Sequence, residues 1–138
     1  MQPIDLLNSA GDRELVEEAI ATRKHAYCPY SQFSVGAAIR CESGGVYKGC
    51  NIENASLGLT ICAERVALFT ALASGERSFV TLALVTERHV ISPCGACRQV
   101  LTEFAPDLRV VTAIVSGPAY SLRLTELLPF PFALEPRR

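Results

Sequence analysis

Hydrophobic and polar residues along the chain first follow the period of a helix and then that of a strand. Apolar side chains share one side of residues 12–26, which predicts an amphipathic helix that Pro29 ends. Over 33–39 apolar residues alternate with polar or small ones, and a Ser-Gly-Gly turn at 43–45 leads to a second strand over 46–50. The pattern therefore predicts a helix followed by a β-hairpin.

The rest of the chain alternates helical segments with continuous apolar runs, as in a sheet covered by helices on both faces. The expected elements are helices over 62–73 and from the turn at 92–95 to Phe104, strands over 79–85, 109–115 and 120–124, and a helical turn over 125–128. With the hairpin, this gives a mixed five-stranded sheet. We predict an α/β fold, a three-layer α-β-α sandwich, with residues 1–138 forming a single domain.

Composition and charge limit the partners of the chain. Of its 138 residues 49% are hydrophobic, and 13 Lys and Arg stand against 14 Asp and Glu, a formal net charge of -1. This excludes disorder and gives no broad electrostatic basis for binding nucleic acid. No stretch approaches the roughly 18 apolar residues of a membrane span, and no basic region precedes an apolar segment at the start. We expect a small-molecule or protein partner, neither nucleic acid nor membrane, and the cytoplasm.

The spacing of the cysteines points to a metal site. Thiols stay reduced in the cytoplasm, which favours metal ligation, nucleophilic chemistry or burial over disulfides for the six cysteines. The two-residue gap between Cys94 and Cys97 lets both sulfurs reach one tetrahedral zinc ion, and the fold can bring Cys62 to the same ion. Both half-sites begin predicted helices, whose dipoles favour thiolates. Three ligands predict a catalytic Zn²⁺, because a structural zinc has four.

Glu64 stands two residues after Cys62, where a carboxyl group can reach a metal-bound water without ligating the metal. This is the place of a general acid and base. A first ligand followed by such a glutamate and later by Pro-Cys-x-x-Cys, here 93–97, is the known signature of zinc nucleobase deaminases. The combination predicts a catalytic site.

The negative charge of three thiolates on one zinc ion calls for an offset nearby. Arg65, directly after Glu64, and Gln99, near the second cysteine pair, could donate hydrogen bonds to the ligand sulfurs. Arg98 could do the same, and its position in the sequence does not separate it from Arg65. We prefer Arg65 because it adjoins Glu64.

A polar loop, 51–54, follows the second strand and adjoins the first half-site. An Asx turn on the surface would explain such a loop if it stood alone. Beside a deaminase site, Asn51 and Glu53 have the donor and acceptor groups that bind sugar hydroxyls. Phe33, at the start of the first strand, is by composition alone a core residue.

At this point the chain resembles the cytidine deaminases of the short, zinc-dependent, homotetrameric type. The matching segments are 27–31, 33–38, 49–55, 61–65, 91–100 and 126–129. The resemblance implies hydrolytic deamination of free cytidine and 2'-deoxycytidine to uridine and 2'-deoxyuridine, with release of ammonia, in pyrimidine salvage. It also implies a homotetramer with pockets shared between subunits.

The resemblance also implies a role for individual residues. It makes Glu64 the proton shuttle of the reaction and assigns one Zn²⁺ to each subunit. The implied zinc ligands are Cys62, Cys94 and Cys97, and the implied substrate-binding residues are Phe33, which stacks on the pyrimidine, Asn51 and Glu53, which bind the ribose, Ala63, and Phe132, which a neighbouring subunit contributes. The Ser92 carbonyl would help to orient the leaving amine.

Three features depart from the family pattern. Leu57 stands where members often carry Tyr, the stretch 86–90 is short, and 130–133 lacks the usual run of small residues. These positions concern the wall of the pocket and therefore the preference among nucleosides.

Other functions stay open at this point. Within the same chemistry, the substrate could be a modified cytosine nucleoside such as blasticidin S. From other classes, the chain could be a non-catalytic zinc-binding module with Cys50 as a fourth ligand, or a redox module using Cys94 and Cys97. His89 is predicted to be a surface loop residue and not a ligand.

Overall fold

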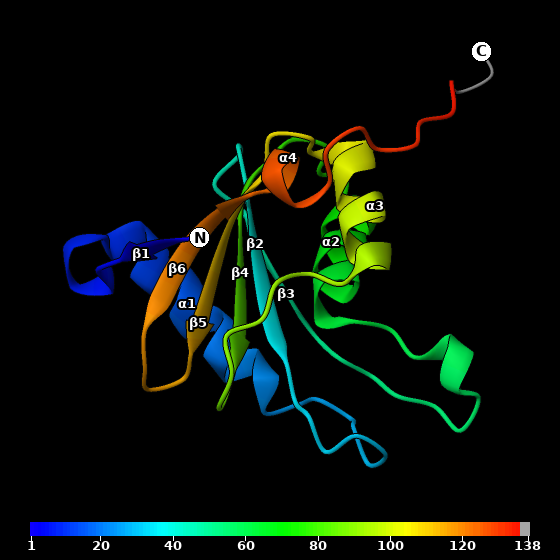
Figure 1. The fold of residues 1–138 in the computed structure, drawn as a ribbon, viewed down its shortest axis with the longest axis horizontal. Coiled ribbons are helices and arrows are strands. Elements are labelled where there is room, and N and C mark those ends of the chain that lie inside the picture. Colours follow the sequence, from blue (N-terminus) through cyan, green and yellow to red (C-terminus); the bar gives the residue numbers. More distant parts are fainter. Residues whose placement is uncertain (136–138) are drawn as a thin grey trace.

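A six-stranded sheet runs through the middle of the molecule, with strand order β1-β6-β5-β4-β2-β3 (Figure 1). The computed structural model describes residues 1–135. The strands are β1 Gln2–Ile4, β2 Gly36–Cys41, β3 Val46–Cys50, β4 Phe79–Thr86, β5 Arg109–Ile114 and β6 Ala119–Arg123. The helices are α1 Ala10–Arg23, α2 Ala63–Ala73, α3 Gly95–Phe104 and α4 Leu124–Leu127, with 3-10 turns η1 Leu6–Asn8 and η2 Leu57–Leu59. None of the described helices is long and apolar enough to cross a bilayer.

The predicted three-layer α/β sandwich with a mixed sheet is confirmed, but the number of strands was one too low. The additional strand is β1, which pairs antiparallel with β6 at the edge of the sheet. Its three residues, Gln-Pro-Ile, are too few to show an alternation in the sequence. The first helix also ends earlier than predicted, at Arg23, six residues before Pro29.

The two faces of the sheet are covered by different helices and carry side chains of different size. In Figure 1, α1 lies on one side of the sheet, and α2 and α3 lie on the other. Alternate residues of a strand face opposite sides. The large side chains Ile39, Leu82 and Leu84 pack in the cluster beneath α2 and α3, whereas the small side chains Ala38, Ala83 and Ala113 pack in the cluster beneath α1.

The strand directions place two helix starts side by side. Because β2 is antiparallel to both β3 and β4, these two strands run in the same direction. Each is followed by a loop and then by a helix on the same face, α2 after β3 and α3 after β4. A Cβ at Gly49 would lie 2.4 Å from the Ala67 nitrogen and 2.5 Å from the Ala63 oxygen, so only glycine lets α2 pack this closely on β3. The N-termini of α2 and α3 therefore meet at one edge of the sheet.

Candidate active site

The two predicted metal half-sites come together where α2 and α3 begin. The sulfurs of Cys62 and Cys94 are 3.7 Å apart, and those of Cys62, Cys94 and Cys97 all lie within 4.8 Å of one another. Tetrahedral zinc, with Zn–S distances of about 2.3 Å, requires sulfurs about 3.8 Å apart. The spacing of the cluster therefore suits a zinc ion.

The surroundings of the Cys62 sulfur favour its thiolate. An Arg65 Nη atom donates to the Cys62 sulfur at 3.5 Å, and the buried Arg65 Nε has no hydrogen-bond partner among residues 1–135. The Cys97 thiol donates a hydrogen bond to the Cys62 sulfur, and this bond, together with the Arg65 guanidinium, lowers the pKa of Cys62 to about 5. The same hydrogen bond and burial raise the pKa of Cys97. Three thiolate ligands of one zinc ion would give the cluster a net negative charge. The Arg65 guanidinium, with one N–H still unpaired, is suited to offset that charge.

Arg65 contacts a ligand sulfur as predicted, but the predicted Gln99 contact is wrong. The Gln99 amide donates instead to the Phe132 carbonyl at 2.8 Å. Arg98 donates to the carbonyls of Pro93 and Leu127, among others. Each residue turns the direction of a helical side chain by about 100°, so Gln99, two positions after buried Cys97, points to nearly the opposite side of α3.

Glu64 lies in the first turn of α2 and is only 4% exposed. Burial, with a smaller contribution from the negative charge of Cys62, raises its pKa to about 7. A carboxyl group with such a pKa is able both to accept and to donate a proton near neutral pH. This chemistry is what a general acid and base requires.

A cavity of about 320 Å³ opens beside Glu64 and the cysteines, within the size range of small-molecule sites. Its lining brings together segments that are far apart in the sequence. It comprises Ser31, Phe33, Val35, Asn51, Glu53, Thr60, Ile61, Cys62, Ala63, Glu64, Ile91, Ser92 and Cys94. All predicted substrate-binding residues except Phe132 are therefore in one pocket, whereas buried Cys97 is not part of its lining.

Asn51 has a structural role that its place in the sequence did not reveal. Its Oδ1 accepts from the Val35 N–H at 2.9 Å, and its Nδ2 donates to the Phe33 carbonyl at 2.8 Å. The strand predicted to start at 33 begins at Gly36, and the Asn51 side chain binds the backbone directly before it. Asn51 thus holds the backbone of Phe33 at the pocket, and one N–H of its amide is left for a ligand.

Glu53, also in the lining of the pocket, is held by the backbone at residues 30 and 31. Its Oε1 accepts from the backbone N–H groups of Tyr30 at 2.9 Å and Ser31 at 3.1 Å. A hydrogen bond from the Ser31 hydroxyl has the largest effect in lowering the pKa of Glu53, and the two backbone N–H groups lower it further. The side chain is therefore an ionised acceptor at neutral pH, suited to a ligand hydroxyl.

Some pocket residues were not among the predicted site residues. Ile61 and Ile91 stand directly before Cys62 and Ser92 and begin the matching segments 61–65 and 91–100, so their nearness to the site residues is the signal that could have found them. Val35 carries no such signal, since it looks like any other core position of a strand.

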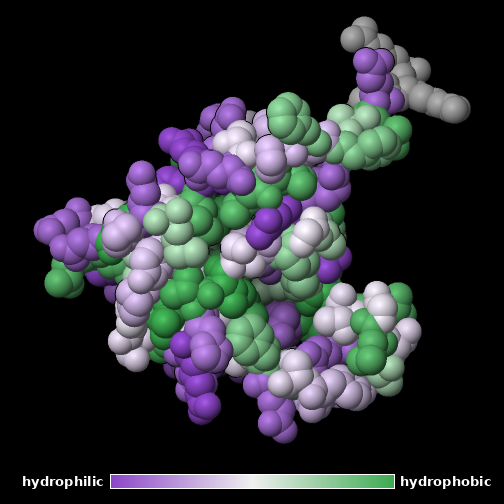
Figure 2. Space-filling view, in the orientation of Figure 1, coloured by the Kyte–Doolittle hydropathy of each residue, from purple (hydrophilic) through white to green (hydrophobic). Residues whose placement is uncertain are grey.

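Phe132 lies outside the pocket of its own chain and is 70% exposed. It belongs to a C-terminal segment that projects from the molecule, as does the segment that carries η2. Figure 2 shows apolar surface on both projections. Their exposed apolar side chains are Leu57, Leu59, Phe130, Phe132 and Leu134.

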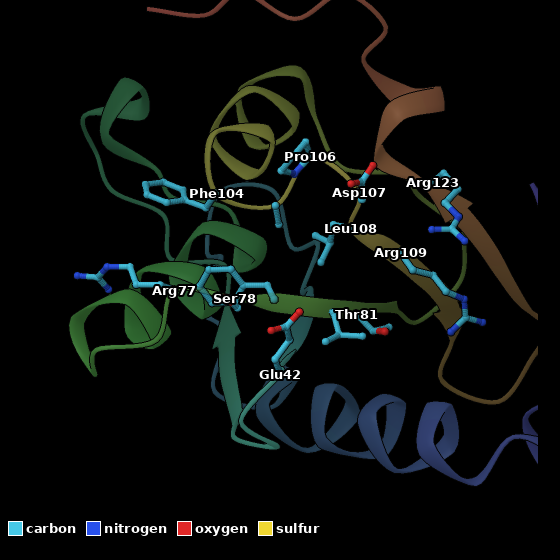
Figure 3. A pocket seen from close by; sticks show the side chains of 13 residues that line it. Glu42, Arg77, Ser78, Thr81, Phe104, Pro106, Asp107, Leu108, Arg109 and Arg123 are labelled. Atoms are coloured by element: carbon cyan, nitrogen blue, oxygen red, sulfur yellow. The ribbon is translucent and has the colours of Figure 1, made fainter. Parts of the chain in front are cut away.

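A larger cavity, of about 510 Å³, lies elsewhere (Figure 3). It lies at the starts of β4 and β5, next to Phe79 and Arg109, and Glu42 points toward it, whereas the Arg77 guanidinium extends away from it. The cysteines follow the ends of β3 and β4, at the opposite edge of the sheet. The larger cavity therefore has no part in the chemistry of the cysteine cluster.

Comparison with known protein families decides what kind of site this is. The sequence profile described as the cytidine and deoxycytidylate deaminase zinc-binding region matches residues 9–114. The chain belongs to this deaminase family. It is a hydrolytic, zinc-dependent enzyme whose substrates are nucleosides.

Individual relatives of the deaminase match over most of their length. It is 48% identical over 127 residues to a cytidine deaminase from Halalkalibacterium halodurans, covering 90% of this chain and 96% of that protein. The crystal structure of cytidine deaminase from Burkholderia pseudomallei superposes with a TM-score of 0.84 at 50% identity, covering 87% of this chain and 98% of that one. A blasticidin-S deaminase from Bacillus cereus is 32% identical over 133 residues, with 90% and 94% covered.

The geometry of the deaminase also bears on the two non-catalytic alternatives. Cys50 is buried and stands outside the sulfur cluster, which among residues 1–135 contains three cysteines, and burial raises the pKa of its thiol. Cys94 and Cys97 are free thiols. Neither a closed four-ligand zinc site nor a disulfide is present in the described part of the chain. His89 is exposed, as predicted.

Proposed function

We propose that this deaminase hydrolyses free cytidine and 2'-deoxycytidine to uridine and 2'-deoxyuridine with release of ammonia. The observation that carries the proposal is one pocket in which the sulfur cluster, a buried carboxyl group and two sugar-binding candidates meet. Cytidine deamination is also the named activity of the Halalkalibacterium halodurans relative.

The residues of the pocket divide the chemistry between them. A zinc ion held by Cys62, Cys94 and Cys97 supplies a Lewis acid that makes water a nucleophile at neutral pH. Glu64 accepts a proton from the attacking water and delivers it to N3 of the pyrimidine as the water oxygen bonds to C4. Glu64 then takes the remaining proton from the oxygen on C4 and passes it to the C4 amine, so that the C4 carbonyl forms as the C–N bond breaks and ammonia leaves. Arg65 offsets the charge of the sulfurs.

The remaining residues orient the nucleoside. Phe33 stacks on the pyrimidine, while Glu53 and the free N–H of Asn51 bind ribose hydroxyls. The Ala63 N–H is one of the groups that a helix leaves unpaired at its start, and it donates to the pyrimidine carbonyl. The Ser92 carbonyl accepts a hydrogen bond from the amine.

The same proposal includes a homotetramer with shared pockets. Phe132 would enter the pocket of a neighbouring subunit, which its exposure and its absence from the lining of its own pocket support. The apolar side chains of the two projecting segments would be covered in the same assembly. We further propose a cytoplasmic, single-domain enzyme of pyrimidine salvage, in keeping with its free cysteines.

A modified cytosine nucleoside is the second candidate substrate. The similarity to the Bacillus cereus blasticidin-S deaminase supports it, as does exposed Leu57 at the position where the family often has an aromatic residue. The proposal of free cytidine ranks first because the similarity to cytidine deaminases is higher.

Turnover of a substrate panel tests the proposal. Zinc-loaded wild type and Glu64→Ala are given cytidine, 2'-deoxycytidine, cytosine and blasticidin S, and the loss of substrate absorbance and ammonia release are measured. Both nucleosides should be deaminated by the wild type alone. Absence of turnover of either nucleoside would overturn the proposal, and turnover of blasticidin S alone would establish the second candidate.

A further inference from the structure

The segment 91–93, which leads from β4 to α3 and lines the pocket, is held by side chains from other parts of the molecule. The Thr112 hydroxyl, from β5, donates to the Ile91 carbonyl at 2.6 Å. The Nε of Arg98, from α3, donates to the Pro93 carbonyl at 2.6 Å. The two bonded carbonyls thus flank Ser92 on both sides along the chain.

Arg98 uses all three guanidinium nitrogens in this arrangement. Besides the Pro93 bond, one Nη donates to the Ser92 hydroxyl and the other to the Leu127 carbonyl, both at 2.8 Å. The guanidinium is a planar, rigid fork, so three bonds in different directions fix its orientation. Arg98 therefore fastens segment 91–93 to the end of α4 and limits its movement.

Thr112 supplies the second fixed point from the core of the sheet. It is fully buried in β5, between apolar neighbours, where valine would have the same shape. Burying a hydroxyl is unfavourable unless it is hydrogen-bonded, and the Ile91 carbonyl provides that partner. The hydroxyl thus fixes the position of a segment that is outside the strands.

These two fixed points hold the peptide groups on both sides of Ser92. The Ile91 carbonyl is bound by Thr112 and the Pro93 carbonyl by Arg98, so the backbone of Ser92 between them is restrained. The Ser92 hydroxyl accepts from Arg98, and Ser92 lines the pocket. Among residues 1–135 no group donates to the Ser92 carbonyl, so this carbonyl is an acceptor that a ligand can use.

We propose that Arg98 and Thr112 are positioning residues that aim the Ser92 carbonyl at the leaving amine of the substrate. The inference rests on the proposed deamination of cytidine. An acceptor fixed in this place binds the amine more strongly as it gains a proton and departs, so its alignment stabilises the transition state.

The test compares a substrate that has the amine with a ligand that lacks it. For Arg98→Met and Thr112→Val, kcat/KM is measured with cytidine, and the inhibition constant is measured for pyrimidin-2-one riboside, which carries hydrogen at C4. We expect kcat/KM to fall about 10- to 100-fold while the inhibition constant and the zinc content stay at wild-type values. Thr112→Ser, which keeps the hydroxyl, should restore kcat/KM.

The matched control is Arg77→Met, because Arg77 also donates to backbone carbonyls, those of Leu72 and Glu76, but away from the site. Its kcat/KM should equal that of the wild type. Equal weakening of catalysis and of inhibitor binding, or unchanged catalysis, would overturn the inference. Should Arg98→Met fail to fold, the Thr112→Val and Thr112→Ser pair decides by the same comparison. A wild type without activity on cytidine would instead contradict the proposed function.

Discussion

Arg109 binds the Asp12 carboxylate through two hydrogen bonds, of 2.7 and 2.8 Å, which join the start of β5 to the first turn of α1. The Asp12 side chain is 10% exposed and also accepts from the Ser9 hydroxyl at 2.9 Å. The Arg109 hydrogen bonds are the main cause that lowers the pKa of Asp12 below its ordinary value of 3.8. The pair therefore links one helical layer to the sheet through an ionised carboxylate.

This pairing predicts a pH-dependent stability. The stabilisation by Asp12 is fully present above pH 3.8, where the carboxyl group is ionised even in the unfolded chain. It is lost as the pH falls from there toward the lower pKa of the folded state. At neutral pH, Asp12→Asn should lower the free energy of unfolding by about 1.5–3 kcal/mol. Urea unfolding at several pH values should show this difference shrinking in acid.

Glu18 provides the control for that measurement, because its ion pair with Lys48 is about half exposed on both sides. Glu18→Gln should change the free energy of unfolding by less than about 1 kcal/mol. Equal effects of the two substitutions on the free energy of unfolding would show that burial does not make the Asp12 pair more stabilising than an exposed ion pair.

Loss of the Glu64 carboxyl group should stop turnover without releasing zinc. General acid and base catalysis by one side chain contributes about 10²- to 10⁴-fold, so Glu64→Gln should lower kcat at least that much. Kinetics with cytidine and zinc analysis by atomic absorption check both expectations. Glu42→Gln, in the larger cavity, should retain full kcat. A loss of activity in Glu42→Gln would show that the larger cavity takes part in the reaction, which would contradict the proposed site.

Removal of single cysteines separates the ligands from the buried thiols. Cys62→Ala should lose zinc and activity, because two sulfurs would remain at the site. Cys50→Ala should keep a full equivalent of zinc, measured after dialysis against a weak chelator. Release of zinc from Cys50→Ala would instead support a four-ligand site.

Asn51 should affect substrate binding through the backbone of Phe33. Asn51→Asp keeps an acceptor for the Val35 N–H but loses the donor to the Phe33 carbonyl. Loss of this exposed hydrogen bond costs about 0.5–1.5 kcal/mol, so KM for cytidine should rise about 2- to 10-fold. The control is Asn54→Ala, which affects an exposed turn in which Asn54 accepts from the Ser56 N–H. An unchanged KM in Asn51→Asp would exclude this coupling.

Gly49→Ala should disturb the start of α2. The added Cβ would lie 2.4 Å and 2.5 Å from backbone atoms of that helix, so the helix that carries Glu64 has to shift. We expect a loss of about 1–3 kcal/mol in the free energy of unfolding, measured by urea titration, together with reduced kcat. Gly58→Ala, where a Cβ would meet open space, should change neither quantity.

Sequence patterns predicted those parts of the molecule that follow from local chemistry. The alternation of side chains locates the strands of the hairpin, and the cysteines at two helix starts predict the sulfur cluster. The partner of the Asn51 amide could not be predicted, because it is the backbone of residues 33 and 35, whose side chains carry no signal for it. The Gln99 prediction failed because it rested on nearness in sequence to Cys97, and a helix turns neighbouring side chains away from each other.

The difference in side-chain size between the two faces of the sheet implies two kinds of tolerance to substitution. Beneath α1, added volume should be the harmful change, at Ala38, Ala83 and Ala113. Beneath α2 and α3, removed volume should be the harmful change, at Ile39, Leu82 and Leu84. A single strand such as β4 would then reject enlargement and truncation at alternate positions along its length.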